Sequence, residues 1–483
     1  MTNPNLSLPG ARLGVATGFL YGYQGTPAYE FGSEIGKFGA ELSKVYFFWS
    51  QIEPEKGRYD WAAVDKFVEQ LDSPENGLIA VFSSSQWATK RPAAILPPSP
   101  AKNSSEYFRF IFELVRHCGG RVRFWQNDAE PSNPVFWGGS KEEFIEGLKV
   151  FYQAVKTADP KASVVVGGYD GLFGPPGTHQ FPNQQAGLDF FDYVLKEGQE
   201  AFDIFDLRLY GDPYTIPARV DFMRQKMLAL GYDKPTICTE YGGPNLFEFP
   251  ENRKYVPLVA AWSQEITNSE GDSSSSPITS ARNALEQLYR NIDVLPPQTQ
   301  MFMAGCSPEL EAKYQRIQAR GIVMRNVFAF SAGVQKTIYW QLPRTPQDGE
   351  ARFHIMALMY GKIGLQHFEH DTLGNRYPSG DTFQRMSNAL RGLRRVEQIA
   401  IANPSIFLFE VIRERRPSCY VLWERRDAFS GEDAPPITFD LPWTASETRA
   451  FDALGRAVPV TLKDKMLHLE VSLTPIFIER DET

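Results

Sequence analysis

The sequence predicts a (β/α)8 barrel followed by a small β-sandwich domain. Between residues 12 and 340, short apolar runs typical of strands alternate with segments of helical periodicity. Strands that alternate with helices form a parallel sheet, and eight such units close into a barrel. After residue 395, short strand-like runs follow one another with no helix between them, as in a sandwich. A chain of 483 residues has room for one large and one small domain.

Eight apolar runs are predicted to be the barrel strands. They cover residues 12–17, 44–49, 77–82, 121–126, 162–167, 202–210, 235–239 and 336–340. The predicted helices carry apolar residues three or four positions apart, as Val64, Phe67 and Leu71 do, which places these side chains on one face. The helices cover residues 29–40, 61–71, 105–118, 141–158, 188–197, 218–230 and 312–332.

Two segments depart from this alternation. Residues 245–307 form an insertion between the seventh and eighth strands, at the face of a barrel where active sites lie. The insertion is either a surface loop or a wall of the active-site cleft. The second segment is predicted to hold strands at 405–413, 418–424, 437–441, 449–452, 458–461 and 466–471. We therefore expect a catalytic barrel over residues 1–394 and a β-sandwich over residues 395–483.

The composition excludes several classes of function. There are 50 Lys and Arg against 58 Asp and Glu, a net charge of −8 with no basic run, so nucleic acid is not an expected partner. The sequence has no apolar run long enough to span a membrane, and its first residues do not resemble a signal peptide. We expect a cytoplasmic enzyme, although a secreted chain whose signal had been removed would look the same. Aromatic residues make up 13% of the chain, and such rings fill cores and stack on sugars.

Two glutamates end predicted strands and are the main candidates for catalysis. Glu130 follows the fourth strand within Arg123–Pro131, and Glu240 ends the seventh strand within Pro235–Gly243. In a barrel, both carboxylates would stand on the same rim, where one can donate a proton while the other, ionised, attacks or activates water. A single glutamate of this kind is more often a solvated loop residue. Two on one rim point to the hydrolysis of glycosidic bonds.

Other catalytic constellations find little support. The sequence lacks a Gly-x-Ser-x-Gly elbow, a phosphate-binding glycine loop and a dinucleotide fingerprint. His367 and His370, with Glu369 between them, could bind a metal, but no matching ligand cluster accompanies them. The four cysteines are scattered and suggest neither a metal site nor a disulfide framework. We therefore expect no metal and no cofactor.

Three short motifs resemble the clan A glycoside hydrolases, and within that clan family 39, the β-xylosidase and α-iduronidase type. Two of them are the segments around Glu130 and Glu240, and the third is WSQIEPEKGRYDW at residues 49–61. The resemblance implies that Glu130 is the acid/base and Glu240 the nucleophile. It also implies that Tyr210 hydrogen-bonds the nucleophile and that Trp340 is the platform under the sugar, although both could simply be packed aromatics at the rim.

Further aromatic residues are expected to line the same pocket. They are Trp49, at the start of the third motif, Trp87, after the third strand, and Trp137, which follows Glu130 in a segment that also fits the family.

Three positions depart from the clan pattern. The asparagine that normally precedes the acid/base is Ala129, the arginine of the second strand is Lys44, and the histidine two residues before Tyr210 is Arg208. Hydrogen bonds to the sugar 2-hydroxyl strengthen in the transition state, so the loss of that amide has three explanations. The sugar is unusual at C2, Asn127 or Asp128 supplies another donor, or activity is lost. Arg208 suggests an acidic sugar, or it pairs with Asp206, Asp212 or a catalytic glutamate.

The sequence thus predicts a retaining glycoside hydrolase that acts by double displacement on an oligosaccharide, polysaccharide or glycoside. Two alternatives remain open. The departures at Ala129, Lys44 and Arg208 would suit a carbohydrate-binding protein that has lost catalysis. A transglycosidase would use the same residues and disfavour water in the second step.

Overall fold

The computed structural model describes residues 8, 10, 12–169, 184–268, 280–344, 349–445 and 448–480. Its centre is a sheet of eight strands, ordered β5-β4-β3-β2-β1-β8-β7-β6, in which every neighbouring pair is parallel. Bridges from Val165 to Ile204 and from Tyr169 to Leu207 join the two edges, so the sheet closes into a barrel. The strands are β1 (Leu13–Ala16), β2 (Leu42–Phe48), β3 (Gly77–Phe82), β4 (Phe124–Asn127), β5 (Ser163–Val166), β6 (Phe205–Asp206), β7 (Thr236–Tyr241) and β8 (Thr337–Tyr339).

The predicted barrel is confirmed, and the sixth strand departs most from its predicted length. Residues 202–210 are predicted to be the sixth strand, but only Phe205–Asp206 pairs regularly. The chain beyond β6 stays extended, and the Leu207 and Leu209 amides donate to the carbonyls of Ile237 and Glu240. A register shift between Cys238 and Tyr241 also interrupts the pairing of β7 with β8.

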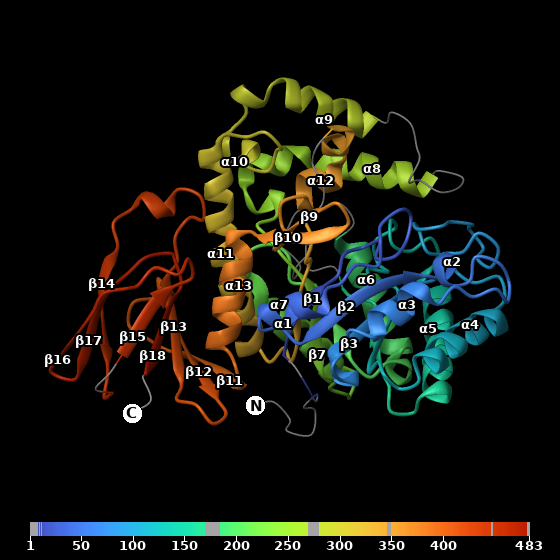
Figure 1. Ribbon diagram of the computed structural model, residues 1–483, viewed down its shortest axis with the longest axis horizontal. Coiled ribbons are helices and arrows are strands. Elements are labelled where there is room, and N and C mark those ends of the chain that lie inside the picture. The colour runs from blue at the N-terminus through green and yellow to red at the C-terminus, as the bar shows by residue number, and fades with distance from the viewer. Residues whose placement is uncertain are drawn as a thin grey trace.

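Helices surround the barrel on the outside (Figure 1). They are α1 (Gly32–Lys37), α2 (Trp49–Ile52), α3 (Ala62–Val68), α4 (Ser104–Cys118), α5 (Lys141–Ala158), α6 (Gln184–Glu197), α7 (Ile216–Ala229) and α11 (Pro308–Ser331). Local sequence explains where several of them begin. The Asn103 side chain accepts the first amides of α4, and Ser140 and Glu143 form a capping box on α5.

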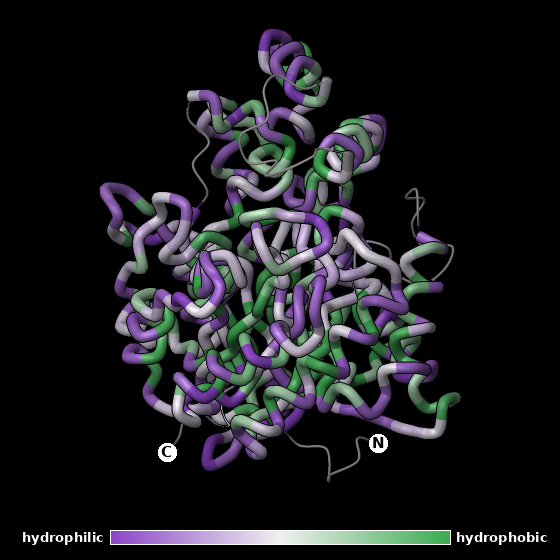
Figure 2. The backbone as a smooth tube through the Cα atoms, turned by 90° about the vertical axis from the view of Figure 1, so that its right-hand side faces the viewer, coloured by the Kyte–Doolittle hydropathy of each residue, from purple (hydrophilic) through white to green (hydrophobic). Residues whose placement is uncertain are grey.

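The strands separate two hydrophobic layers. Along β2, Val45 and Phe47 pack against the surrounding helices, whereas Tyr46 and Phe48 belong to the cluster inside the barrel. This alternation follows from the two-residue period of a strand, and it decides which side chains can reach a site in the barrel. Figure 2 shows hydrophobic stretches running through the body of the molecule, with hydrophilic segments on its outer loops.

The insertion between β7 and β8 is largely helical and stands above the barrel in Figure 1. Its described elements are α8 (Val256–Asn268), α9 (Ser280–Arg290) and α10 (Pro297–Gln300), and α12 (Ile355–Tyr360) joins them from the segment after β8. Helices α8, α9 and α12 contribute to one hydrophobic cluster, which also includes Phe247.

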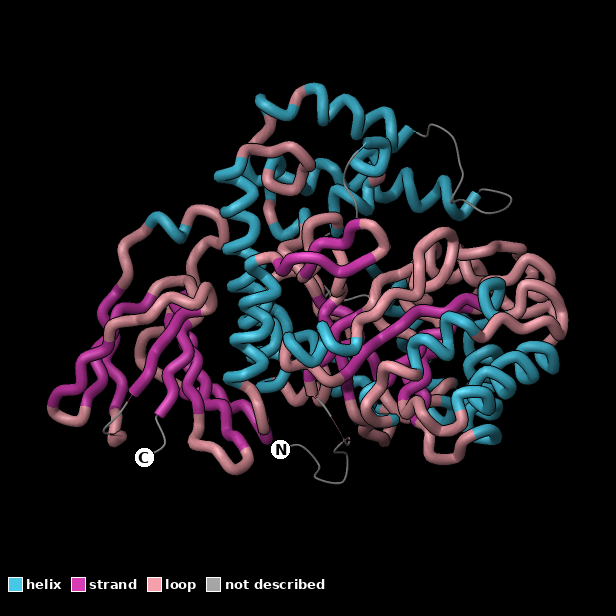
Figure 3. The backbone as a smooth tube through the Cα atoms, viewed as in Figure 1, coloured by secondary structure: helices cyan, strands magenta, loops and turns pink. Residues whose placement is uncertain are grey.

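Two antiparallel sheets form the C-terminal part, to the left in Figure 3. One has the order β11-β12-β13-β18-β15 and the other β14-β17-β16. Their strands are β11 (Leu393–Ile399), β12 (Ile406–Arg413), β13 (Cys419–Glu424), β14 (Ile437–Pro442), β15 (Thr448–Asp452), β16 (Val460–Lys463), β17 (Met466–Val471) and β18 (Ile476–Arg480). The predicted sandwich is confirmed, and β11 and β18 add to the six expected strands. Phe328 of α11 packs against Phe407, Phe409 and Trp423 of the first sheet, which joins it to the barrel.

In the described part of the chain, no helix is both long and apolar enough to cross a membrane.

Candidate active site

The carboxylate of Glu240, at the end of β7, is held mainly through one of its oxygens. Its Oε1 accepts hydrogen bonds from Lys44 Nζ at 2.9 Å and from the Tyr46 hydroxyl at 2.6 Å. Arg208 Nη1 lies 2.8 Å from the same oxygen. The other oxygen, Oε2, accepts one longer bond of 3.2 Å from the Tyr210 hydroxyl. Three donors therefore anchor Oε1 and leave Oε2 as the oxygen better able to react.

The surroundings of Glu240 favour its ionised form. Burial would raise the pKa of Glu240, but the Arg208 and Lys44 cations outweigh burial and lower this pKa below its ordinary value. Burial in turn lowers the pKa of Lys44 to about 8, although the Glu240 carboxylate partly offsets that effect. At neutral pH the carboxylate is ionised and most Lys44 side chains carry a charge.

Glu130 approaches another nitrogen of the same guanidinium. Its Oε1 is 3.5 Å from Arg208 Nε, and 12% of its side chain is exposed. Glu130 follows β4, and its carbonyl accepts the amide of Asn133 in the turn that carries the chain away from the barrel. The two predicted catalytic glutamates therefore meet at one buried arginine.

Arg208 itself is held by buried polar groups inside the barrel. Its Nη1 donates to Thr239 Oγ1 at 2.6 Å and lies 3.5 Å from the Asp206 carboxylate. Asp206 accepts further bonds from the Thr239 amide and from Gln126 Nε2, both at 2.7 Å. Gly168 gives the guanidinium its space, since a Cβ at that position would lie 2.5 Å from Arg208 Nε.

The structure also brings Trp340 to this cluster. The ring of Tyr360 in α12 packs edge-on against both Tyr210 and Trp340, with ring centroids 5.5 Å apart in each case. The Trp340 amide donates to the carbonyl of Tyr241, directly after Glu240 in the chain. The predicted Trp340 therefore stands at the mouth of the barrel beside the nucleophile candidate.

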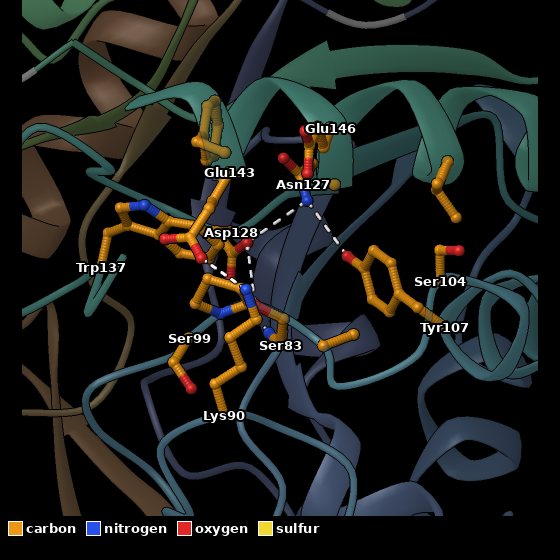
Figure 4. Close-up of a pocket in the computed structure, with 15 residues that line it drawn as sticks. Ser83, Lys90, Ser99, Ser104, Tyr107, Asn127, Asp128, Trp137, Glu143 and Glu146 are labelled. Atoms are coloured by element: carbon orange, nitrogen blue, oxygen red, sulfur yellow. Dashed lines mark hydrogen bonds and ion pairs between the residues drawn. The ribbon is translucent and has the colours of Figure 1, made fainter. Parts of the chain in front are cut away.

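Asn127 and Asp128 do not face the glutamates, which corrects the expectation that they bind the sugar. The side-chain amide of Asn127 donates to the Tyr107 hydroxyl of α4 at 3.1 Å. The Asp128 carboxylate accepts from the backbone amide and the hydroxyl of Ser83. Figure 4 shows both in a small pocket bordered by α4 and α5. Because Gln126 of β4 points into the barrel, the next residue must point outward.

Trp49, Trp87 and Trp137 also lie in the layer between barrel and helices. Trp49 stacks on Phe110 and donates to Glu53 Oε2 at 2.8 Å. Trp87 donates to the Glu53 carbonyl and Trp137 to the Ser140 carbonyl. Their indole nitrogens are thus satisfied within the protein, and these three aromatics are packing residues instead of the expected sugar contacts.

Several site residues were not predicted from the sequence. Tyr46, Thr239 and Gln126 join the network without being expected there, whereas Asp206 is expected only as a partner of Arg208 and Lys44 only as a departure from the clan pattern. Strand alternation could have indicated Tyr46, because it lies two residues after Lys44 on the same face of β2. Nothing in the local sequence indicates Tyr360, since it reaches the site from α12.

The buried Asp128 leads to a prediction about stability. Burial raises the pKa of Asp128 to about 7, despite the Ser83 hydrogen bonds that lower it. The folded protein therefore holds this proton more tightly than the unfolded chain does. Protonated Asp128 therefore stabilises the folded protein, and this contribution is fully present below about pH 4. It is lost as the pH rises to about 7, which lowers the free energy of unfolding by about 4 kcal/mol in total.

The Asp128→Asn variant should not show this loss. Relative to wild type, we expect the variant to gain stability between about pH 5 and about pH 8, measured as the free energy of unfolding in urea. The exposed Asp72→Asn serves as the control and should follow wild type. An equal stability difference at both pH values would contradict the prediction.

The remaining candidate, the histidine pair, lies outside this site. His367, in the β9 strand (Gln366–Glu369), shares a hydrogen bond of 3.0 Å with the Tyr377 hydroxyl and stacks on its ring. Within the described ranges, no group of three or more His, Cys, Asp and Glu side chains is placed to hold a metal ion.

Comparison with solved structures relates this architecture to known enzymes. The chain is similar to a family 39 glycoside hydrolase from the gut symbiont Bacteroides cellulosilyticus, with a TM-score of 0.63 and 14% identity over 97% of this chain and 81% of the other. It is also similar to a glucosidase from Croceicoccus marinus, with a TM-score of 0.53 and 14% identity over 99% and 98% of the two chains. The fold is one that glycoside hydrolases use.

A third solved structure extends the comparison. It is a family 51 α-L-arabinofuranosidase from Bifidobacterium longum, with a TM-score of 0.54 and 12% identity over 98% of this chain and 97% of the other. No protein-family model matches the chain, and no curated protein matches it by sequence. At these identities the comparison establishes the fold of the barrel and of the C-terminal sheets.

Proposed function

We propose that the protein is a retaining glycoside hydrolase in which Glu240 is the nucleophile and Glu130 the general acid/base. The observation that carries this proposal is the meeting of both carboxylates at Arg208, with Glu240 anchored through Oε1 and ionised. The glycoside hydrolases with a similar fold support the same reading. No metal or cofactor takes part in the proposed reaction.

The proposed mechanism has two steps. Glu240 Oε2 attacks the anomeric carbon while Glu130 donates its proton to the leaving oxygen, which forms a glycosyl-enzyme ester and releases the alcohol. Glu130, now a carboxylate, then takes a proton from water as the water attacks the same carbon and releases Glu240. Two inversions restore the starting configuration.

Arg208 is proposed to replace the amide that Ala129 lacks. Its Nη2 is buried and has no hydrogen-bond partner among the described residues, although it belongs to the guanidinium that both glutamates share. A donor in this position suits the sugar 2-hydroxyl. The Arg208 and Lys44 cations are already balanced by the carboxylates of Glu240 and Asp206, and Glu130 starts the reaction protonated, which favours a neutral sugar over an acidic one.

A panel of activated aryl glycosides tests the proposed function. Wild-type protein should hydrolyse at least one member, and the matching 2-deoxy-2-fluoro glycoside should label the peptide that contains Glu240, as read by mass spectrometry. If no glycoside of the panel is hydrolysed but saccharides still bind, the result would favour a carbohydrate-binding protein. Transfer to an added sugar acceptor in preference to water would favour a transglycosidase.

The charge of Arg208 predicts a change in the pH profile. In Arg208→Met, Glu240 loses its strongest cationic neighbour, so its pKa rises. We expect the acidic limb of kcat/KM to move to higher pH, by about 1 to 3 units for the loss of such a pair. Arg208→Lys keeps the charge and should leave the limb closer to wild type. An unchanged acidic limb in Arg208→Met would show that this guanidinium does not set the ionisation of the nucleophile.

A further inference from the structure

A cavity of about 520 Å³ lies at the mouth of the barrel, between the loops that follow the strands and the helices above them. The loop after β1 contributes Phe19 and Leu20 to its lining, and the loop after β3 contributes Ile95 and Leu96. The helices α8 and α12, which stand above the barrel in Figure 1, close the cavity from the other side with Trp262, Ile266, Met356 and Tyr360. The volume lies in the range of about 300 to 1,000 Å³ of small-molecule sites.

Four of the polar side chains that line this cavity are hydrogen-bonded or ion-paired within the protein. The Tyr21 hydroxyl donates to the Tyr29 carbonyl, and the Tyr29 hydroxyl donates to the Thr17 carbonyl. Arg344 pairs with Glu311 at 3.1 Å. His354 accepts the Met356 amide at the start of α12. A saccharide chain needs hydrogen-bond partners at each ring, and these groups are already committed elsewhere.

Two series of contacting side chains lead from the cavity to Glu240. The Phe19 ring, which lines the cavity, packs on Tyr46 at 5.5 Å, and the Tyr46 hydroxyl donates to Glu240. On the other side, Trp340 and Tyr360 line the cavity, and Tyr360 contacts Tyr210, which also donates to Glu240. Because Trp340 lines the cavity and is expected to lie under the sugar, a group bound in the cavity would adjoin that sugar.

We infer that the cavity binds an apolar alkyl or aryl group carried by the substrate, so that the substrate class is an amphipathic glycoside instead of a polysaccharide. This inference rests on the proposed function, because the glutamates place the sugar. It assigns Phe19, Leu20, Trp262 and Met356 as residues that determine specificity. It also gives the insertion a role, since α8 supplies Trp262 and Ile266 to one wall.

The inference is tested by binding of n-butyl and n-octyl β-D-thioglucosides and thioxylosides, which resist hydrolysis. Dissociation constants are measured by intrinsic tryptophan fluorescence below the concentration at which the octyl compounds aggregate. Each buried methylene tightens binding about fourfold, so four additional methylenes should tighten it about 10²-fold. 1-Octanol lacks the sugar and should bind at least about tenfold more weakly than the octyl thioglycoside that binds best.

Variants of Met356 locate the effect in the cavity. Met356→Asp places a charge in the lining and should reduce the octyl-to-butyl ratio to less than about tenfold. Met356→Leu should keep the ratio of the wild type. Leu228→Asp, at an apolar position of α7 that is 44% exposed, is the matched control and should also keep it. If Met356→Asp fails to fold, Leu20→Asp tests the opposite wall.

The outcomes separate this inference from the proposed function. Equal dissociation constants for butyl and octyl compounds in the wild type would overturn the inference, as would an undiminished octyl preference in both Met356→Asp and Leu20→Asp. Binding of 1-octanol as tight as that of the octyl thioglycosides would show that the cavity is not linked to a sugar site, which also overturns it. A chain-length effect without hydrolysis of any aryl glycoside would retain the cavity assignment and reject the catalytic one.

Discussion

Glu240→Gln should reduce kcat on an activated aryl glycoside by about 10⁶-fold, the scale on which a hydrolase loses activity when its covalent nucleophile is removed. The amide cannot form the glycosyl ester. The change also leaves Lys44 and Arg208 in a buried site without the carboxylate that both contact. Breaking such a pair costs about 3–5 kcal/mol, so the melting temperature should fall as well.

The effect on activity must be separated from this loss of stability. Activity is therefore measured well below the melting temperature of the variant, and labelling by the 2-deoxy-2-fluoro glycoside is followed by mass spectrometry. The 2-fluoro reagent should leave Glu240→Gln unmodified. Glu55→Gln, whose side chain is 72% exposed, is the matched control and should behave as the wild type. Activity within tenfold of wild type in Glu240→Gln would reject Glu240 as the nucleophile.

Glu130→Ala should slow the hydrolysis of glycosides with poor leaving groups by about 10²- to 10⁴-fold, because general acid/base assistance is lost. With a good leaving group the first step needs little protonation, so the glycosyl-enzyme should form and accumulate. Azide needs no deprotonation and can enter the space left by the carboxylate. It should restore turnover and yield a glycosyl azide.

The configuration of that azide decides the mechanism. In double displacement, azide attacks the ester on Glu240 and gives a product with the anomeric configuration of the substrate. The product is identified by nuclear magnetic resonance, and Glu55→Ala with azide is the control that should give none. A glycosyl azide of inverted configuration would contradict the assignment of the two glutamates.

Much of the barrel could be predicted because its signals are local. The strand Gly77–Phe82 and the helix Lys141–Ala158 have the predicted bounds, since an apolar run and a capped periodic segment each define their own ends. β6 was overestimated, because regular pairing there depends on its neighbours in the barrel. β18 pairs with residues distant in sequence and was not predicted; β11 was not predicted either, although it pairs with the next strand, β12.

Some features of the candidate site likewise follow from the sequence, and others only from the tertiary structure. The sequence alone indicated that Glu130 and Glu240 follow strands and share one rim, because position along a strand is a local property. The family resemblance implied that Tyr210 and Trp340 accompany them. Tertiary structure decided which side chains face inward. It turned Asn127, Asp128 and the tryptophans Trp49, Trp87 and Trp137 toward the helices, and it brought Tyr46, Arg208 and α12 to the carboxylates. The physical reason is that facing depends on strand register and helix packing, which join residues that the sequence keeps far apart.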